Sequence, residues 1–513
     1  MALILRTVKG SPLTWQEGDD NLTYLQSVDL MVSGSGTCST QRSGSANSAS
    51  GDYSTVSGGY GNTASAYVTT VGGGYGNTAS SYYSTISGGY QNTTSCSCGN
   101  ETIAGGNQNT SNNYDTSIGG GFNNTASGNG STVAGGEDNT SSGNQSVVGG
   151  GLSNVASADH STVSGGYHNT ASSNYAIVGG GRGNTASNYY TVVAGGFNNN
   201  ASCNTATIGG GISNTASGHA SVIAGGRDNT VSGNCSTVSG GYTNTASAAY
   251  STVSGGGYNT ASGCYSTIGG GADNSSTGNW SVVGGGINNC ITTNYATISG
   301  GQGNTASGNY GYQAIGGGLS NTAICEQSTI GGGRCNTSSC YQTTISGGAS
   351  NTASNYTSTV GGGFQNTASG PNATVGGGAT NTASGDQSTV GGGRCNTASN
   401  YYSTISGGYS NAACGYSSTI SGGQCNTASA EGSTVSGGAC NTASGICSAI
   451  LGGFNNNTCN FADAMIVGSS ICAVAACTLH ANCLWLGNIP TSAAGLAVGT
   501  VWSDSGVLKI VTA

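Results

Sequence analysis

A fifteen-residue phrase repeats along most of this chain, and its constant period limits the folds that the chain can adopt. The segment "STVSGGYGNTASAYVTTVGGGYGNTASSYYSTISGG", which begins at Ser54, contains the phrase three times. We use the apolar residue of each "ST(V/I)" triplet as the marker of a copy. A regular period of this length is typical of proteins built from stacked structural repeats.

The marker recurs 27 times between Val56 and Ile450, every 15 residues except for two steps of 17. These two steps end at Ile103 and Ile315, and their extra residues lie before the marker, in "CSCGNE" and "GNYGYQ". Insertions at one fixed place in a repeat predict a surface loop there. A degenerate copy, "STQRSGSANSAS", precedes the first regular one, and a shifted copy ends at Ile466.

Three positions of the repeat hardly vary, and each has a physical reason. Two glycines follow the marker by two and three residues in every copy, as Gly58 and Gly59 do, which predicts a bend with positive φ or a close backbone approach. Asn stands six residues after every marker; Asn tolerates the left-handed region, and stacked amides can hydrogen-bond between turns. Two residues later comes a small residue, usually Ala as at Ala64, which predicts a narrow interior.

We expect these asparagines to form a ladder along the repeats. The first members are Asn62, Asn77, Asn92, Asn109, Asn124, Asn139, Asn154, Asn169, Asn184, Asn199 and Asn214.

Each copy thus has the pattern of a strand, a Gly-Gly bend, a second short strand and a variable corner. Fifteen residues that close one turn predict an all-β fold, a parallel β-solenoid or β-roll of about 27 to 29 turns. The solenoid is expected to span residues 39–465. Residues 1–38 form a small separate N-terminal segment in this prediction, and residues 466–513 a C-terminal β-rich tip.

Composition and charge exclude several classes of function. The chain has 97 Gly and only 5% charged residues, unlike an ordinary globular enzyme. Eight Lys and Arg in 513 residues, with a net charge of −9, cannot form the basic surface that nucleic acid requires. The start, "MALILRTVKGSPLTW", has too short an apolar run for a signal peptide, and 18 consecutive apolar residues occur nowhere. We therefore expect no nucleic-acid partner, no membrane insertion and assembly in a cytoplasm.

The repeat also predicts self-association, because one Val or Ile and one Ala per turn bury little apolar surface against the entropy of ordering fifteen residues. The residue before the marker is mostly Thr and points away from the interior. In five copies it is aliphatic, which predicts a contact with another protomer, most simply in a parallel homotrimer. These residues are Val147, Ile177, Val192, Val222 and Val282.

Aromatic residues at variable positions are the candidate receptor contacts. The residue four after the marker varies widely, which predicts exposure, and in three successive copies it is Tyr60, Tyr75 and Tyr90. Trp485 and Trp502 are the candidates in the tip. Tyr also recurs three residues before the marker, where the rings either form ridges that stack on sugars or simply cover a glycine-rich corner. These are Tyr53, Tyr83, Tyr175, Tyr190, Tyr250 and Tyr402.

One cysteine-rich segment is a candidate metal site. "CAVAACTLHANC" brings Cys472, Cys477, His480 and Cys483 within twelve residues, which suits zinc or iron, although packing in an alternating strand is the alternative. The repeat fixes no carboxylate pair, Ser/His/Asp set or Cys/His dyad. We therefore predict no enzymatic activity and no cofactor.

The phrase "STVSGGYGNTAS" followed by another "ST(V/I)" resembles the head repeats of trimeric autotransporter adhesins over about four fifths of the chain. That resemblance implies trimeric left-handed parallel β-rolls. Those adhesins also carry a signal peptide and a membrane-anchor barrel, neither of which is found in this sequence.

Both ends resemble bacteriophage tail fibres. "GSPLTWQEGDDNLTYLQ" is similar to the N-terminal segment of phage virion proteins with an LT-x-x-E-x-D-x-N-(F/L) pattern, matched here by Leu13, Glu17, Asp19, Asn21 and Leu22. "LWLGNIPTSAAGLAVGTVWSDSGVLKIVTA" is similar to the short β-rich ends of such fibres, with "SDSG" as a hairpin turn. The resemblance implies attachment to other virion or baseplate proteins through the N-terminus.

We therefore expect a structural fibre of a phage virion, assembled in the host cytoplasm and acting outside the cell. It would bind a host-surface glycan or protein through its shaft or tip. A cellular trimeric adhesin or extracellular filament subunit is the first alternative, and a glycan-cleaving tailspike is the second.

Overall fold

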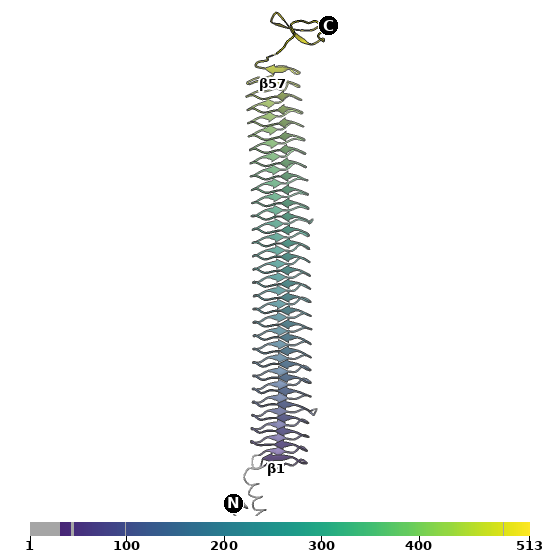
Figure 1. Ribbon diagram of the computed structural model, residues 1–513, viewed down its shortest axis with the longest axis vertical. Coiled ribbons are helices and arrows are strands. Elements are labelled where there is room, and N and C mark those ends of the chain that lie inside the picture. Colours follow the sequence, from purple (N-terminus) through teal and green to yellow (C-terminus); the bar gives the residue numbers. More distant parts are fainter. Residues whose placement is uncertain (1–30, 43–45, 98, 486, 513) are drawn as a thin grey trace, which may run out of the picture. The chain divides into compact units, whose positions relative to one another are not determined.

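The computed structural model describes residues 31–42, 46–97, 99–485 and 487–512. The chain divides into two compact units, residues 1–303 and residues 304–513. The described residues of both units are all-β and contain no helix, and they form a parallel β-solenoid of about 29 turns spaced about 15 residues apart. This confirms the fold class that the repeat period predicts (Figure 1).

In the first unit, two columns of short parallel strands alternate along the chain. The even-numbered strands, from β4 (Thr55–Val56) to β36 (Thr297–Ile298), end at the marker residue. The odd-numbered strands, from β3 (Ser48–Ala49) to β35 (Cys290–Ile291), end eight residues after a marker. Each of these strands is two residues long and pairs with the strand one turn away, so that marker lies opposite marker.

The second unit repeats this arrangement. Its even-numbered strands run from β38 (Ala314–Ile315) to β56 (Ala449–Ile450), and its odd-numbered strands from β37 (Thr305–Ala306) to β55 (Thr442–Ala443). Parallel pairing continues from β56 to β57 (Met465–Val467), where Ile450 lies opposite the marker of the shifted copy. It extends further to β58 (Leu479–Ala481).

Two antiparallel strand pairs accompany the regular turns. In the first unit β1 (Met31–Ser33) pairs antiparallel with β2 (Thr40–Arg42), which itself pairs in parallel with β4, as expected for the degenerate first copy. β1 thereby covers a strand edge that would otherwise be open to pairing with another chain. In the second unit β59 (Val501–Asp504) and β60 (Val507–Ile510) form the antiparallel hairpin predicted around "SDSG".

Four columns of side chains fill the interior of each turn. We count positions from the marker, which is position 0. Positions 0 and 8 supply the apolar core, which in the first regular turn consists of Val56 and Ala64. Position 6 is the ladder Asn, and position −2 is usually Ser or Thr. Val56, Ala64, Asn62 and Ser54 are all 0% exposed. The interior is therefore narrow, as predicted, and about half of it is polar.

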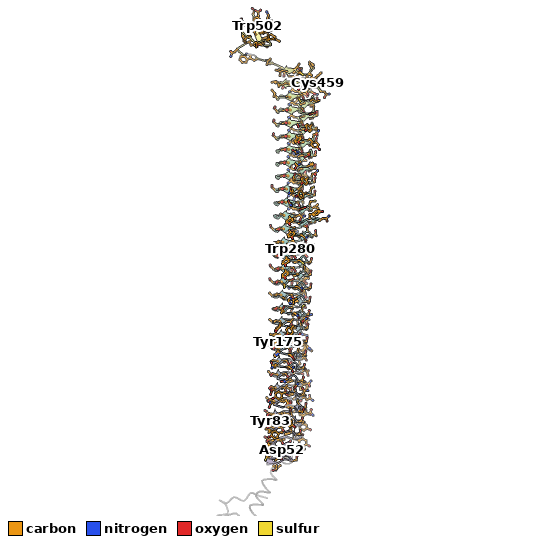
Figure 2. The ribbon with its side chains drawn as sticks, turned by 90° about the vertical axis from the view of Figure 1, so that its right-hand side faces the viewer. Asp52, Tyr83, Tyr175, Trp280, Cys459 and Trp502 are labelled. Carbon is orange, nitrogen blue, oxygen red and sulfur yellow. A yellow bond between two sulfur atoms is a disulfide. The ribbon has the colours of Figure 1, made fainter. Side chains whose placement is uncertain are left out.

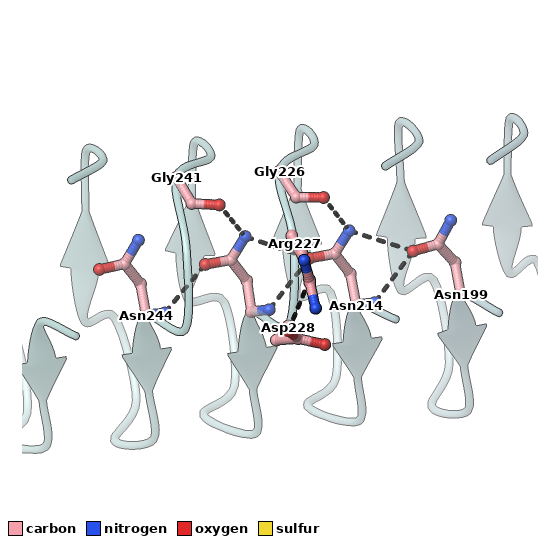
Figure 3. Close-up of polar contacts among 8 residues, drawn as sticks. Asn199, Asn214, Gly226, Arg227, Asp228, Gly241 and Asn244 are labelled. Carbon is pink, nitrogen blue, oxygen red and sulfur yellow. Dashed lines mark hydrogen bonds and ion pairs between the residues drawn. The ribbon is translucent and has the colours of Figure 1, made fainter. Parts of the chain in front are cut away.

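The asparagines at position 6 form a continuous hydrogen-bond ladder within each unit (Figure 3). The Nδ2 of Asn199 donates to Gly195 O in its own turn and to Gly211 O in the next, both at 2.9 Å. Its Oδ1 accepts the backbone N–H of Asn214 at 3.0 Å. One buried amide thus satisfies three backbone groups and ties two turns together, at a place where unpaired polar groups would be costly.

The second glycine of each pair leaves room for this ladder. Gly59 has a φ of 82°. A Cβ on it would lie 1.9 Å from Gly74 O and 2.7 Å from Asn62 Nδ2. Any side chain here would collide with both the next turn and the ladder amide, so the second glycine and the Asn are required together.

Replacing Asn184, Asn199 and Asn214 together by Ala should destabilise the first unit. Each substitution leaves buried backbone groups unpaired, at about 1–3 kcal/mol per group. We expect a lower melting temperature by circular dichroism and faster hydrogen exchange in the turns around residues 180–217.

The matched control replaces Ser187, Ser202 and Ser217, on the outside of the same three turns, by Ala. Equal losses of stability in the two triple variants would contradict a role for the ladder.

Left-handed backbone occurs at two positions that the sequence analysis did not assign to it. The ladder asparagines do not have positive φ; the residues at positions 5 and −3 do, for example Gln91 at 52° and Tyr53 at 58°. Even the β-branched Val68 adopts a φ of 54°. No glycine pattern marks these positions, because the backbone bonds between turns hold whichever residue stands there.

The turns that carry two extra residues have a long polar side chain at position −2. In the second unit Gln313 Nε2 donates to the carbonyl oxygens of Ser307 at 3.2 Å and Tyr310 at 2.6 Å and so supports the inserted loop. In the first unit Glu101 takes this position and is 0% exposed. Burial raises the pKa of the Glu101 carboxyl, and the Ser81 hydroxyl lowers it to a smaller extent.

Glu101→Gln should stabilise the chain at neutral pH. Because the pKa of the Glu101 carboxyl is higher in the folded state than in the unfolded state, the protonated carboxyl stabilises the folded chain relative to the ionised one. This stabilisation is complete below the unfolded pKa and is lost as the pH rises through the folded pKa. Gln is neutral at all pH values and already occupies the equivalent position, Gln313.

Melting temperatures measured between pH 4 and pH 7 test this. The melting temperature of the wild type should fall progressively below that of the Gln variant as the pH rises. A constant difference between the two proteins would exclude a titrating Glu101.

Among the residues that the structure describes, none forms a helix that is long and apolar enough to cross a membrane.

Candidate functional site

The tyrosines predicted as receptor contacts form a stack on the surface of the first unit. Tyr60, Tyr75 and Tyr90 occupy position 4 of successive turns and are joined by parallel bridges. Their ring centroids are 5.6 and 5.3 Å apart, with interplanar angles of 19° and 8°. Both faces of the middle ring are therefore covered, and the column presents ring edges and hydroxyl groups to the solvent.

Other residues at position 4 also pair along the column. The Arg182 guanidinium lies over the rings of Tyr167 and Phe197, one turn away on either side, at 5.1 and 5.5 Å. Arg227 lies over Tyr242 at 5.5 Å and pairs with Asp228 at 3.0 Å (Figure 3). Position 4 follows no single residue type along the sequence, but residues 15 apart at this position are spatial neighbours, so the cation–π pairs can be found by comparing successive copies.

The tyrosines at position −3 form a second aromatic column. Tyr250, Tyr265, Trp280 and Tyr295 make a four-ring stack, with centroids 4.6, 5.4 and 5.1 Å apart. Tyr175 and Tyr190 are stacked as well, at 4.9 Å. Figure 2 places Tyr83, Tyr175 and Trp280 along the surface of the first unit.

Stacked rings cannot offer their covered faces to a sugar, so only rings at the ends of a stack, or outside one, suit sugar stacking. Tyr67 is such a ring: it stands at 83° to Tyr53 and at 87° to Tyr83, with centroids 5.6 Å apart in both pairs. The sequence analysis named Tyr53 and Tyr83 but not Tyr67, which lies one position earlier in the repeat.

A second ladder of Asn and Asp runs along the corner at position −4. Asn144 Oδ1 accepts the backbone N–H of Asn129 at 3.1 Å, and Asp159 Oδ1 accepts that of Asn144 at 3.0 Å. Asp52 Oδ1 accepts the N–H of Thr37 at 2.8 Å, which lowers the pKa of the Asp52 carboxyl. This ladder is exposed, and the sequence analysis missed it because the position also holds Tyr, Gly, Ala and Cys.

The two tip tryptophans differ in their surroundings. Trp485 is 86% exposed. The Lys509 ammonium group lies over the ring of Trp502, on β59, at 5.4 Å from the ring centroid. Lys509 also pairs with Asp504, which lowers the pKa of that carboxyl.

The metal site predicted in the cysteine-rich segment is not assembled. Cys472 is joined to Cys459 in a disulfide, so its sulfur is not a free ligand. His480 Nε2 lies 2.7 Å from Thr478 Oγ1. No group of three His, Cys, Asp or Glu residues suited to a metal ion occurs in the described part of the chain.

A count of turns could have revealed the disulfide. Asn457 and Cys472 are paired across adjacent turns, which brings Cys459 close to Cys472. The attachment residues Leu13, Glu17, Asp19, Asn21 and Leu22 lie outside the described residues.

Comparison with known proteins leaves the family open: no protein-family model matches the sequence, and no curated protein matches it.

Proposed function

We propose that this chain is a structural fibre of a bacteriophage virion and that it attaches the particle to the host surface. The observation that carries this proposal is the repetition of the same outward-facing columns on turn after turn of each unit. At about 4.8 Å per turn, the turns from β4 to β36 alone extend for roughly 80 Å.

Repeated columns suit adhesion through many weak contacts. Any surface feature that binds one host group recurs, or can recur, at a fixed distance along the unit, so weak contacts add up to firm attachment. The proposed contacts are the exposed aromatic rings at positions 4, −3 and −4 that end a stack or lie outside one, together with the tip residue Trp485. The N-terminal segment would join the chain to other virion or baseplate proteins, as its resemblance to phage fibre proteins implies.

The proposal is tested by electron microscopy of virions labelled with gold-conjugated antibodies against this chain. We expect label on fibres that project from the particle. Label on the envelope of uninfected cells, with bare virions, would contradict the proposal and favour the cellular adhesin.

A parallel homotrimer is part of the proposal. Val147, Ile177, Val222 and Val282, at position −1 of the first unit, are 37–41% exposed in the single chain. This column of aliphatic and Thr side chains faces outward from the marker strands, where two further copies of the chain would cover it.

We expect the purified protein to have a mass of about three times 49.5 kDa by light scattering. Ile177→Lys together with Val222→Lys should shift this mass towards the monomer, because the interface would bury unpaired charges. Ile212→Lys is the matched control, since Ile212 is 44% exposed but lies in the column at position 4. A monomeric wild type would contradict the trimer.

A further inference from the structure

The corner segments, which we define as the residues between an odd-numbered strand and the next even-numbered strand, line an open surface hollow in the first unit. Its volume is about 600 Å³, within the range of small-molecule sites. The lining combines aromatic rings, hydroxyl groups and one carboxylate. Its main contributors are Asp52, Tyr67, Tyr82, Tyr83, Ser50 and Ser65.

The rings of this hollow keep accessible surface. Tyr67, Tyr82 and Tyr83 are 41%, 48% and 56% exposed. Tyr67 and Tyr83 stand at 87° to each other, so they form two walls, unlike the stacked rings elsewhere on the unit. Their centroids lie 5.6 Å apart, so the two rings are in edge-to-face contact, and a ligand would lie beside this pair and not between the rings.

The carboxylate gives the hollow a negative charge. Asp52 Oδ1 accepts the Thr37 N–H, which favours the ionised form, and the exposed Asp52 side chain lines the hollow. None of the residues that line the hollow is basic. A neutral ligand that covered this carboxylate would remove water from it without supplying a counter-charge, which is costly.

The second unit has a hollow at the same positions of the repeat. It is lined by Pro371, Asp386 and Tyr401, which occupy position −4 of three successive turns, and its volume is about 260 Å³. Pro371 stands one turn before Asp386, where Thr37 stands before Asp52, but proline has no N–H to donate. The Asp386 carboxylate therefore lacks the backbone bond of its counterpart, and its Oδ1 instead accepts a hydrogen bond from Asn372 Nδ2 at 3.4 Å.

We propose that both hollows bind an amino sugar, a pyranose unit with a free protonated amino group, whose ammonium pairs with Asp52 or Asp386 while its C–H face packs on Tyr67 or Tyr401. The ammonium supplies the missing counter-charge and can also approach a ring face. A bare metal ion does not suit the site, because a single carboxylate is far from the six to eight oxygens that Ca²⁺ takes. This inference names the class of host ligand and therefore rests on the proposed function in host attachment.

The test compares two disaccharides that differ mainly in charge. Isothermal titration calorimetry of the full-length protein at pH 6.5 and low salt would use the β-1,4-linked glucosamine disaccharide and its fully N-acetylated form. We expect the charged sugar to bind about five- to tenfold more tightly, the size expected for one partly exposed ion pair.

The double variant Asp52→Asn, Asp386→Asn should abolish this preference. Asn is native at the same position in Asn144, where it accepts the same kind of backbone bond, so the fold should be kept. Tyr67→Ala with Tyr401→Ala should weaken binding of both sugars. The matched control is Asp159→Asn, which removes the same charge from the same column outside either hollow and should leave binding unchanged.

Equal affinity for the two disaccharides, no binding of either, or equally tight binding of choline would each overturn the inference. The labelling experiment on virions is independent of these results. Labelled virions without sugar binding would remove the amino-sugar inference alone, whereas sugar binding by a chain absent from virions would remove the proposed function and keep the site.

Discussion

The buried amide of Asn at position 6 is the interaction on which each unit depends. A fifteen-residue turn has only two short strands, so much of its backbone must be satisfied outside the regular strand pairs. The ladder satisfies the backbone at the Gly-Gly bend. Asn62 Nδ2 donates to the carbonyl oxygens of Gly58 and Gly74, and Asn62 Oδ1 accepts the N–H of Asn77. A shift of register by one residue would break all three bonds and would also drive a side chain into the space beside Gly59.

Because the interior fixes the register, the outside can vary without loss of the fold. At position 4 the chain carries Tyr60, Glu137, Arg182 and Ala272 on the same scaffold, and their backbones make the same parallel bridges. Stacked rings and Arg–ring pairs then arise only where neighbouring turns happen to carry them. Stability and surface chemistry are in this way separated into different columns, which suits a protein that displays many copies of a contact.

The period, the register, the ladder and the narrow core could be predicted from the sequence because each rests on a residue type that recurs in every copy. The features that were missed depend on pairs of residues in different turns. Left-handed backbone at Tyr53, the Cys459–Cys472 disulfide and the loop support from Gln313 are set by bonds within or between particular turns, not by a residue type that recurs in every copy. The metal prediction likewise used the spacing of cysteines along the chain and not across turns, where Cys472 pairs with Cys459.

The corner at position −4 shows how a charge can be placed there without cost to the fold. Asn and Asp present the same oxygen to the N–H of the preceding turn, as Asn144 and Asp159 do at 3.1 and 3.0 Å. Exchange between them alters the charge of the surface and leaves the backbone bond in place. Asp52 and Asp386 are therefore not required as carboxylates by the ladder, and a ring follows each of them one turn later, at Tyr67 and Tyr401. At both places an exposed ring therefore lies beside a carboxylate that the fold does not require, and this pair of groups suits a contact site for a ligand.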